Sequence, residues 1–295
     1  WLAYGADLSL LQTAKDTAAA ARESLRLTQA RLAAGVAPRT DVRQAEIVLG
    51  TAEADVAAQT TAVAQDRNAL RLLVGAEVAD AELPVSIADA TARIGEVPAG
   101  LDSTILLRRP DVAASEWQLR AANAQVGAAR AALFPRITLT GLLGFASDAL
   151  GTLFDHGNFG WQAGGAASYS IFSGGAGKAN LRLSKAQRDA ALASYRRAIE
   201  SAFADVANVL ARRGTIEAQL AAVRSADAAA ADNLQLADLR YRGGITSYLA
   251  DLTARQARYS AARSLVNVQL VRATNRVALY RSLGGDAFAE MPATH

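Results

Sequence analysis

The chain has 295 residues, of which 51% are hydrophobic and 20% charged, and its net charge is +3. It contains no cysteine and two histidines, which excludes disulfides, cysteine-based zinc sites and thiol catalysis. The basic residues are spread singly along helical patterns, so the charge does not predict nucleic-acid binding, and no apolar run reaches the roughly 20 residues of a membrane-spanning helix.

A helical hairpin, the incomplete first copy of a repeat, is predicted over residues 1–75. Its first helix is Ala-rich and ends at Gly35, which can adopt a positive φ. Its second helix keeps helical spacing of apolar residues over about 39–74, and Thr40 or Asp41 is predicted to cap it. Because Ala occurs on several faces, each helix can pack against two neighbours.

The next two segments differ sharply in pattern. Residues 76–107 contain prolines and glycines that interrupt long elements, and we expect a linker with short pieces packed outside the main body. Residues 108–134 predict a helix, because Pro110 suits the first turn and Pro135 disfavours helix at the residue before it.

Between residues 135 and 173 the hydrophobic period changes to two, which predicts a hairpin of two strands joined by a turn-rich segment. One face is apolar and the other small or polar, as in a transmembrane β-barrel strand. A soluble hairpin packed on a helix is the alternative. One hairpin cannot close a barrel, so a barrel requires several chains. The residues predicted to face lipid are Ile137, Leu139, Leu143, Phe145, Trp161, Tyr169 and Ile171.

A second long helical hairpin is predicted over residues 174–285. Its first helix runs without a convincing break from about 177 to 242 and would span on the order of 100 Å. Gly244 lies at the turn, and a returning helix follows. An ordinary antiparallel coiled coil is the alternative to a cylinder of helices. The tail, residues 286–295, is expected to be disordered.

The two helical hairpins are copies of one another. Aligning Gly35 with Gly244 gives an offset of 209 residues, and the same offset aligns Gly75 with Gly284. The second copy is preceded by a strand pair and a long helix, whereas little precedes the first. We therefore expect the chain to be a fragment that lacks a targeting segment, another hairpin and more helix before Trp1.

Five motifs occur in order along nearly the whole chain: Leu107–Asp111, Gly127–Ile137, Ile171–Gly175, Ala237–Tyr241 and Ala278–Gly285. They resemble motifs of the outer membrane factor family, the TolC-like trimeric channels of Gram-negative bacteria, and in particular of the lipoprotein branch that serves drug-efflux pumps. The resemblance implies a homotrimer with a β-barrel in the outer membrane and a long-helix α-barrel in the periplasm, and a lipid-bearing cysteine on the missing N-terminal segment.

The resemblance also implies a function: a passive export duct for drugs and other small molecules, opened by an inner-membrane transporter and its periplasmic adaptor. Asp41 and Tyr241 match a pair that links the helical tips, and Leu249 matches an apolar constriction. The positions of an acidic entrance ring hold Ala250 and Thr253 instead. The residues assigned to the tips are Gly35, Asp41, Tyr241, Gly244, Leu249 and Asp251.

No catalytic, cofactor or metal site is predicted. The segment from Ser173 to Lys178 lacks the spacing of a phosphate-binding loop, and His156 is expected in a solvated turn. Two other functions remain open: a duct for a type I protein exporter, and a soluble coiled-coil scaffold or adaptor.

Overall fold

The computed structural model describes residues 1–98 and 100–285. The chain divides into two compact units, one formed by residues 1–102 with 204–295 and the other by residues 103–203. Each unit is considered by itself. The expected disorder of residues 286–295 lies outside the described residues.

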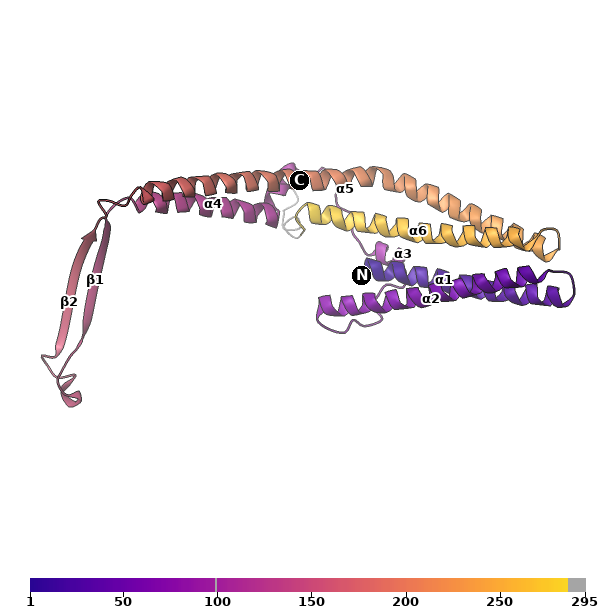
Figure 1. The fold of residues 1–295 in the computed structure, drawn as a ribbon, viewed down its shortest axis with the longest axis horizontal. Helices are drawn as coiled ribbons and strands as arrows, with labels where there is room; N and C mark the ends of the chain where they lie inside the picture. The colour runs from indigo at the N-terminus through magenta and orange to yellow at the C-terminus, as the bar shows by residue number, and fades with distance from the viewer. Residues whose placement is uncertain (99, 286–295) are drawn as a thin grey trace. The chain divides into compact units, whose positions relative to one another are not determined.

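The first unit is built from antiparallel helices (Figure 1). They confirm the helical segments predicted from periodicity, with bounds within a few residues except at the start of the first helix. Among the described residues, no helix is long and apolar enough to cross a membrane. The helices of this unit are α1 (Leu2–Ala33), α2 (Arg39–Val74), α3 (Ile87–Ala92), the later part of α5 (Ala176–Arg242) and α6 (Tyr248–Ser282).

The turns between α1 and α2 and between α5 and α6 have the same backbone geometry. Gly35 has a φ of 73° and Gly244 a φ of 72°. The amide of Gly35 donates to the carbonyl of Leu32 at 2.9 Å, and the amide of Gly244 donates to that of Tyr241 at 3.0 Å. Helices α2 and α6 begin 209 residues apart, as the repeat predicts. A side chain at either glycine would be strained in this left-handed region.

The predicted caps of α2 are wrong. Its N-cap is Pro38, which has an extended backbone (φ −76°, ψ 156°) and no side-chain group that could accept a capping hydrogen bond. Proline is accommodated at this boundary because its fixed φ suits the entry to a helix and its missing N–H removes no helical hydrogen bond. Asp41 therefore lies inside the first turn, where a carboxylate interacts favourably with the helix dipole.

The prediction that the segment after α2 packs outside the main body is wrong. In the structure, this segment contributes to the core. Ile87 is 2% exposed and clusters with Ala6, Val266 and Ala273. The close approach is possible because Gly5 of α1 has no side chain: a Cβ there would lie 2.9 Å from the carbonyl oxygen of Ser86. Periodicity missed this packing because a six-residue helix presents too few apolar residues to show a face.

The second unit contains η1 (Ser103–Arg108), α4 (Pro110–Ala131), the hairpin and the first part of α5. Pro110 is the first residue of α4, as predicted. Leu133, just after the end of α4, packs on the first turn of α5, since a Cβ on Gly177 would lie 2.7 Å from its Cδ2.

The hairpin pairs β1 (Arg136–Phe145) with β2 (Phe159–Ser168), joined by a segment with the short helix η2 (Leu150–Thr152). Its antiparallel register sets Ile137 opposite Ala167 and Leu143 opposite Trp161. Directly opposed residues share a face, so the predicted apolar residues of both strands lie together. Every residue of both strands is exposed.

Two residues predicted to face lipid lie outside the strands. Tyr169 and Ile171 follow the end of β2 at Ser168. The last pair joins Arg136 to Ser168, so the next residue of the partner strand is Pro135. Proline has no N–H to continue the ladder, which explains why the pairing ends there.

Candidate functional site: the paired helix tips

An aromatic cluster joins the two helical tips. Tyr241, at the end of α5, is 3% exposed, and Tyr248, at the start of α6, is 1% exposed. Their ring centroids lie 5.5 Å apart, and both pack with Ala45 of α2. Leu25 of α1 packs against the same cluster, so residues from all four helices meet here.

Arg31 of α1 connects the first tip to the second. Its Nη1 donates a 2.6 Å hydrogen bond to the carbonyl oxygen of Tyr241. The guanidinium also lies 4.8 Å from the centroid of the Tyr241 ring. A hydrogen bond from a charged donor and a cation–π contact are thus supplied by one side chain.

Thr28 completes this connection one turn earlier on α1. Its Oγ1 lies 3.2 Å from the hydroxyl of Tyr241 and donates a 2.8 Å hydrogen bond to the carbonyl oxygen of Ser24. Thr28 is fully buried. The Tyr241 hydroxyl therefore has a partner inside the core, as a buried phenol requires.

The structure does not join the predicted pair Asp41 and Tyr241 within this chain. Among the residues described, no hydrogen bond links them, and the Tyr241 hydroxyl meets Thr28 instead. Sequence reasoning missed Thr28 and Arg31. One available signal was that Thr28 continues the helical spacing of Ala14, Ala18 and Ala21. The alignment of Arg31 with Arg240 across the repeat was another, because it marked a cation at the same position of each tip.

Asp251 lies close to the second tip but faces inward. It is completely buried, and its Oδ2 accepts a 2.7 Å hydrogen bond from Nε of Arg255. Arg255 also donates to Asp238 at 2.7 Å, and Arg242 contacts the other oxygen of Asp238. The repeat explains this orientation, since Asp251 occupies the position of the buried Val42 in the first copy. It is not placed for an exposed acidic ring.

The remaining predicted tip residues lie on the turns or at their edge. Gly35 and Gly244 form the turns, and Leu249 is 61% exposed. Asp41 is half-buried. Burial raises the pKa of the Tyr248 hydroxyl, and the charge of Asp251 acts in the same direction. Tyr248 thus stays a neutral phenol over a wide pH range.

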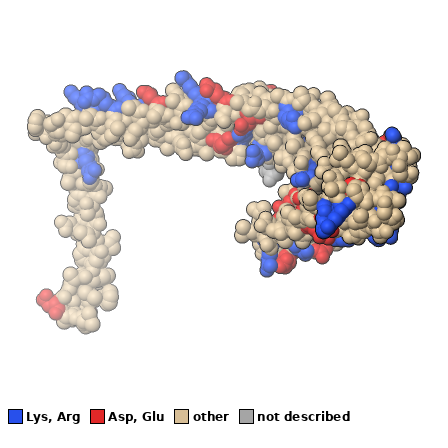
Figure 2. Space-filling view, turned by 45° about the vertical axis from the view of Figure 1, so that its right-hand side comes forward, with Lys and Arg blue, Asp and Glu red and all other residues tan. Residues whose placement is uncertain are grey.

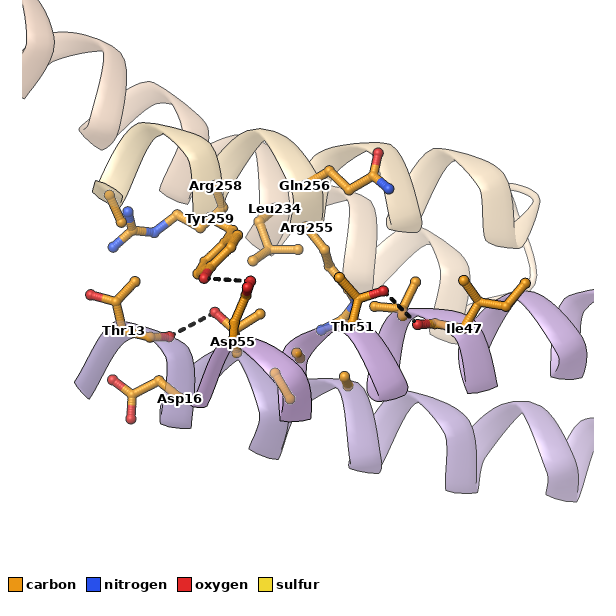
Figure 3. A pocket seen from close by; sticks show the side chains of 16 residues that line it. Thr13, Asp16, Ile47, Thr51, Asp55, Leu234, Arg255, Gln256, Arg258 and Tyr259 are labelled. Carbon is orange, nitrogen blue, oxygen red and sulfur yellow. Dashed lines mark hydrogen bonds between the residues drawn. The ribbon is translucent and has the colours of Figure 1, made fainter. Parts of the chain in front are cut away.

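A groove lies between the two helical hairpins (Figure 3). It is farther from the turns than the aromatic cluster of Tyr241 and Tyr248. It encloses about 340 Å³ and is lined by α1, α2, α5 and α6. Across it, the hydroxyl of Tyr259 donates a 2.8 Å hydrogen bond to Asp55. This is a second polar link between the hairpins, and Arg258 beside it pairs with Asp227 of α5.

The links at the tips and across the groove are hydrogen bonds, ion pairs and ring contacts that can break and re-form without covalent chemistry. Within the described part of the chain, no group of three or more acidic or histidine side chains is arranged to hold a metal ion.

Comparison with known proteins identifies the family. The family model described as "Outer membrane efflux protein" matches residues 2–76 and 101–285. The chain belongs to the outer membrane efflux protein family. Membership confirms the resemblance and the fold class predicted from the sequence, that of channels combining an α-barrel with a β-barrel.

Named members of the outer membrane efflux protein family are similar over nearly the whole chain. The chain is 41% identical over 283 residues to the solvent efflux pump outer membrane protein SrpC of Pseudomonas putida, covering 95% of the chain and 59% of that protein. It is 34% identical to outer membrane protein OprJ of Pseudomonas aeruginosa, covering 97% and 60%. The chain thus spans about three fifths of the length of these relatives.

Solved structures of the outer membrane efflux protein family share the fold. A membrane protein from Pseudomonas aeruginosa aligns with a TM-score of 0.84 and 34% identity, covering 96% of the chain and 66% of that structure. The open state of the Neisseria gonorrhoeae MtrE outer membrane channel aligns with a TM-score of 0.76 and 34% identity, covering 97% and 66%.

Proposed function

We propose that the protein carrying this chain is the outer-membrane exit duct of a tripartite efflux system, through which drugs and other small molecules pass from the periplasm to the exterior. The observation that carries the proposal is the two-faced hairpin in a chain of the outer membrane efflux protein family. Relatives named as outer membrane proteins of solvent and toluene efflux pumps support this substrate class.

The hairpin has the dimensions of a membrane-crossing strand pair. Each strand has 10 residues, which at about 3.3 Å per residue extend roughly 33 Å. With the usual tilt, such strands span an apolar band about 25 Å tall. On the face assigned to lipid, Ile137, Leu139 and Trp161 are 81%, 87% and 75% exposed. Apolar side chains this exposed are suited to burial against lipid.

The duct requires further chains and partners. Two strands leave unpaired edges, so closing a barrel calls for other copies, and a homotrimer is the assembly that we propose. A periplasmic adaptor and an inner-membrane transporter supply the substrate and the energy. The chain itself acts as a passive passage, and we assign it no catalytic group.

The helical tips act as the gate of this duct. In the closed state, Thr28 and Arg31 hold Tyr241, which keeps the tip of α1 and α2 against the tip of α5 and α6. Opening separates the tips and breaks these contacts. Leu249, exposed beside the turn, narrows the entrance, and Asp41 contributes to the contacts between tips of different chains.

The proposal is tested by purifying the intact protein in detergent, measuring its mass, and recording currents in planar bilayers. A trimer that forms discrete ion-conducting channels is the expected result. A water-soluble monomer or dimer that needs no detergent would instead indicate a coiled-coil scaffold or adaptor. Transport of an unfolded polypeptide but not of small molecules by the reconstituted system would indicate a protein-export duct.

A further inference from the structure

We propose that a basic collar at the root of the hairpin, formed by Arg130, Lys178, Arg182 and Lys185, binds the anionic headgroups of phospholipids on the helix side of the membrane. The inference rests on the proposed function, because it requires the hairpin to cross a bilayer. It adds to that function a lipid-binding surface that selects anionic lipid.

Charge is distributed unevenly along the hairpin. Residues 137–177 contain no Lys or Arg, and their acidic residues are Asp148 and Asp155, in the segment that joins the two strands. Basic residues resume at Lys178, directly after the hairpin. Figure 2 shows the hairpin almost free of charge, with acidic side chains at its loop end and basic ones at its root and along the adjoining helix. The uncharged part of the strands thus has acidic residues at its loop end and basic residues at its other end.

The collar residues of α5 lie together on one side of the helix. Lys178, Arg182 and Lys185 are spaced by four and three residues, which places them on one face. Lys178 directly follows Gly177, and Lys185 directly follows Ser184. Both of these preceding residues pack inward. The three basic side chains are therefore turned away from the buried side and are exposed.

Arg130 extends the collar from the neighbouring helix. It lies in the last turn of α4, one turn before Leu133, which contacts the first turn of α5 at Gly177. Arg130 is exposed as well. Two helices thus present cations at the same level of the unit, immediately next to the hairpin.

These cations are not neutralised by the protein. In the described ranges, none of the four collar residues forms an ion pair with an acidic side chain. The nearest acid along α5, Asp189, pairs with Arg188 at 2.7 Å. An unpaired cluster of this kind attracts anions, and each basic side chain near an anionic membrane strengthens binding roughly fivefold.

The position of the collar favours a lipid headgroup over other anions. Phe134 and Phe172, at the root of the hairpin, are 67% and 88% exposed, and aromatic side chains at strand ends mark the boundary between membrane and water. Collar side chains beside them reach headgroup depth, because Lys and Arg extend their charged ends to the interface. The phosphate groups of anionic phospholipids lie at this depth.

The test titrates the intact protein, in neutral detergent and about 0.1 M salt, with dihexanoyl phosphatidylglycerol and with dihexanoyl phosphatidylcholine, which differ only in the headgroup. The wild type is expected to bind the anionic lipid at least about tenfold more tightly. Combining Lys178→Gln, Arg182→Gln and Lys185→Gln should remove most of this preference. The matched control combines Lys15→Gln, Arg213→Gln and Arg224→Gln, which removes the same charge from exposed positions in the other unit.

Equal binding of the two lipids by the wild type would overturn the proposal, as would an equal loss in both triple variants. Displacement of the lipid by inorganic phosphate at the same concentration would assign the site to free phosphate and overturn lipid selection. Membrane entry is measured separately, through quenching of Trp161 by brominated phosphatidylcholine in a variant with Trp1→Phe and Trp117→Phe. Quenching without anionic preference would reject the collar alone, and no quenching would reject the exit duct as well.

Discussion

Arg31 and Tyr241 lie 210 residues apart in the chain and meet at the helical tips, where Arg31 donates a 2.6 Å hydrogen bond to the Tyr241 carbonyl oxygen and its guanidinium lies 4.8 Å from the ring centroid. One side chain therefore ties the first copy of the repeat to the second. The contact lies within one chain, so each protomer of an assembly would carry its own.

Removing this contact should favour the open gate. Arg31→Ala removes a hydrogen bond from a charged donor, a loss of about 1.5–3 kcal/mol, which favours separated tips by tenfold or more. We expect a higher open probability in planar bilayers, with partial restoration in Arg31→Lys. Arg22→Ala is the matched control, because it breaks an exposed ion pair with Glu53 farther from the turn on the same helix. Equal currents in Arg31→Ala and Arg22→Ala would show that Arg31 does not hold the gate.

The buried ion pairs behind the second tip should respond unequally to removal of their members. Arg255→Ala leaves Asp251 fully buried without its cation and should lower the free energy of unfolding by about 3–5 kcal/mol. Asp251→Val leaves Arg255 paired with Asp238 and restores the side chain found in the first copy, so its cost should be below about 1 kcal/mol. Denaturant titration in detergent measures both, and similar losses would contradict the assignment of Asp251 to the core.

Stability should depend on pH through Asp7 of α1. Burial and then the nearby carboxylate of Asp66 raise the pKa of Asp7. The folded chain therefore binds this proton more tightly than the unfolded chain. The stabilising contribution is complete below the ordinary carboxyl pKa of about 4 and is lost as the pH rises through the raised folded pKa. Asp7→Asn should increase the melting temperature at pH 7 and flatten its dependence on pH. Asp16→Asn, on the same helix but exposed, is the control, and an equal change in both variants would exclude a specific role of Asp7.

Two glycines in helices should respond oppositely to alanine. In α1, a Cβ on Gly5 would lie 2.9 Å from the carbonyl oxygen of Ser86 and 3.0 Å from Cβ of Ala90, so Gly5→Ala should cost about 1–3 kcal/mol by displacing α3. In α2, Gly50 has open space around it, and Gly50→Ala should stabilise the helix by about 0.5–1 kcal/mol. Thermal unfolding distinguishes the two, and a gain in both would mean that α3 does not pack on Gly5.

The two faces of the hairpin should tolerate charge differently. Leu139 lies on the apolar face and Thr140 on the other. Leu139→Arg places a charge towards lipid near the middle of the strand and should cost about 2–4 kcal/mol in folding into vesicles, whereas Thr140→Arg should cost much less. The folded fraction after reconstitution measures the difference. A greater loss for Thr140→Arg would reverse the assignment of the faces.

Local sequence patterns predicted the elements well because each depends on nearby residues. A glycine at a positive φ ends α1 and α5 at equivalent positions, and the apolar period of two identifies β1. The end of β2 was missed, because it depends on Pro135 of the partner strand. The predicted link between Asp41 and Tyr241 rested on positions carried over from a family. Within this chain, the Tyr241 hydroxyl lies beside the Thr28 hydroxyl instead.

By itself, the sequence determined the duplication, the long helices, the two-faced hairpin and the resemblance to a channel family, because repeat, period and motif are properties of the chain order. Only the tertiary structure decided that Arg31 holds Tyr241, that Asp251 is buried against Arg255, and that α3 enters the core. The contacts of Arg31 and of α3 join residues far apart in the chain, and the burial of Asp251 likewise depends on how the helices pack.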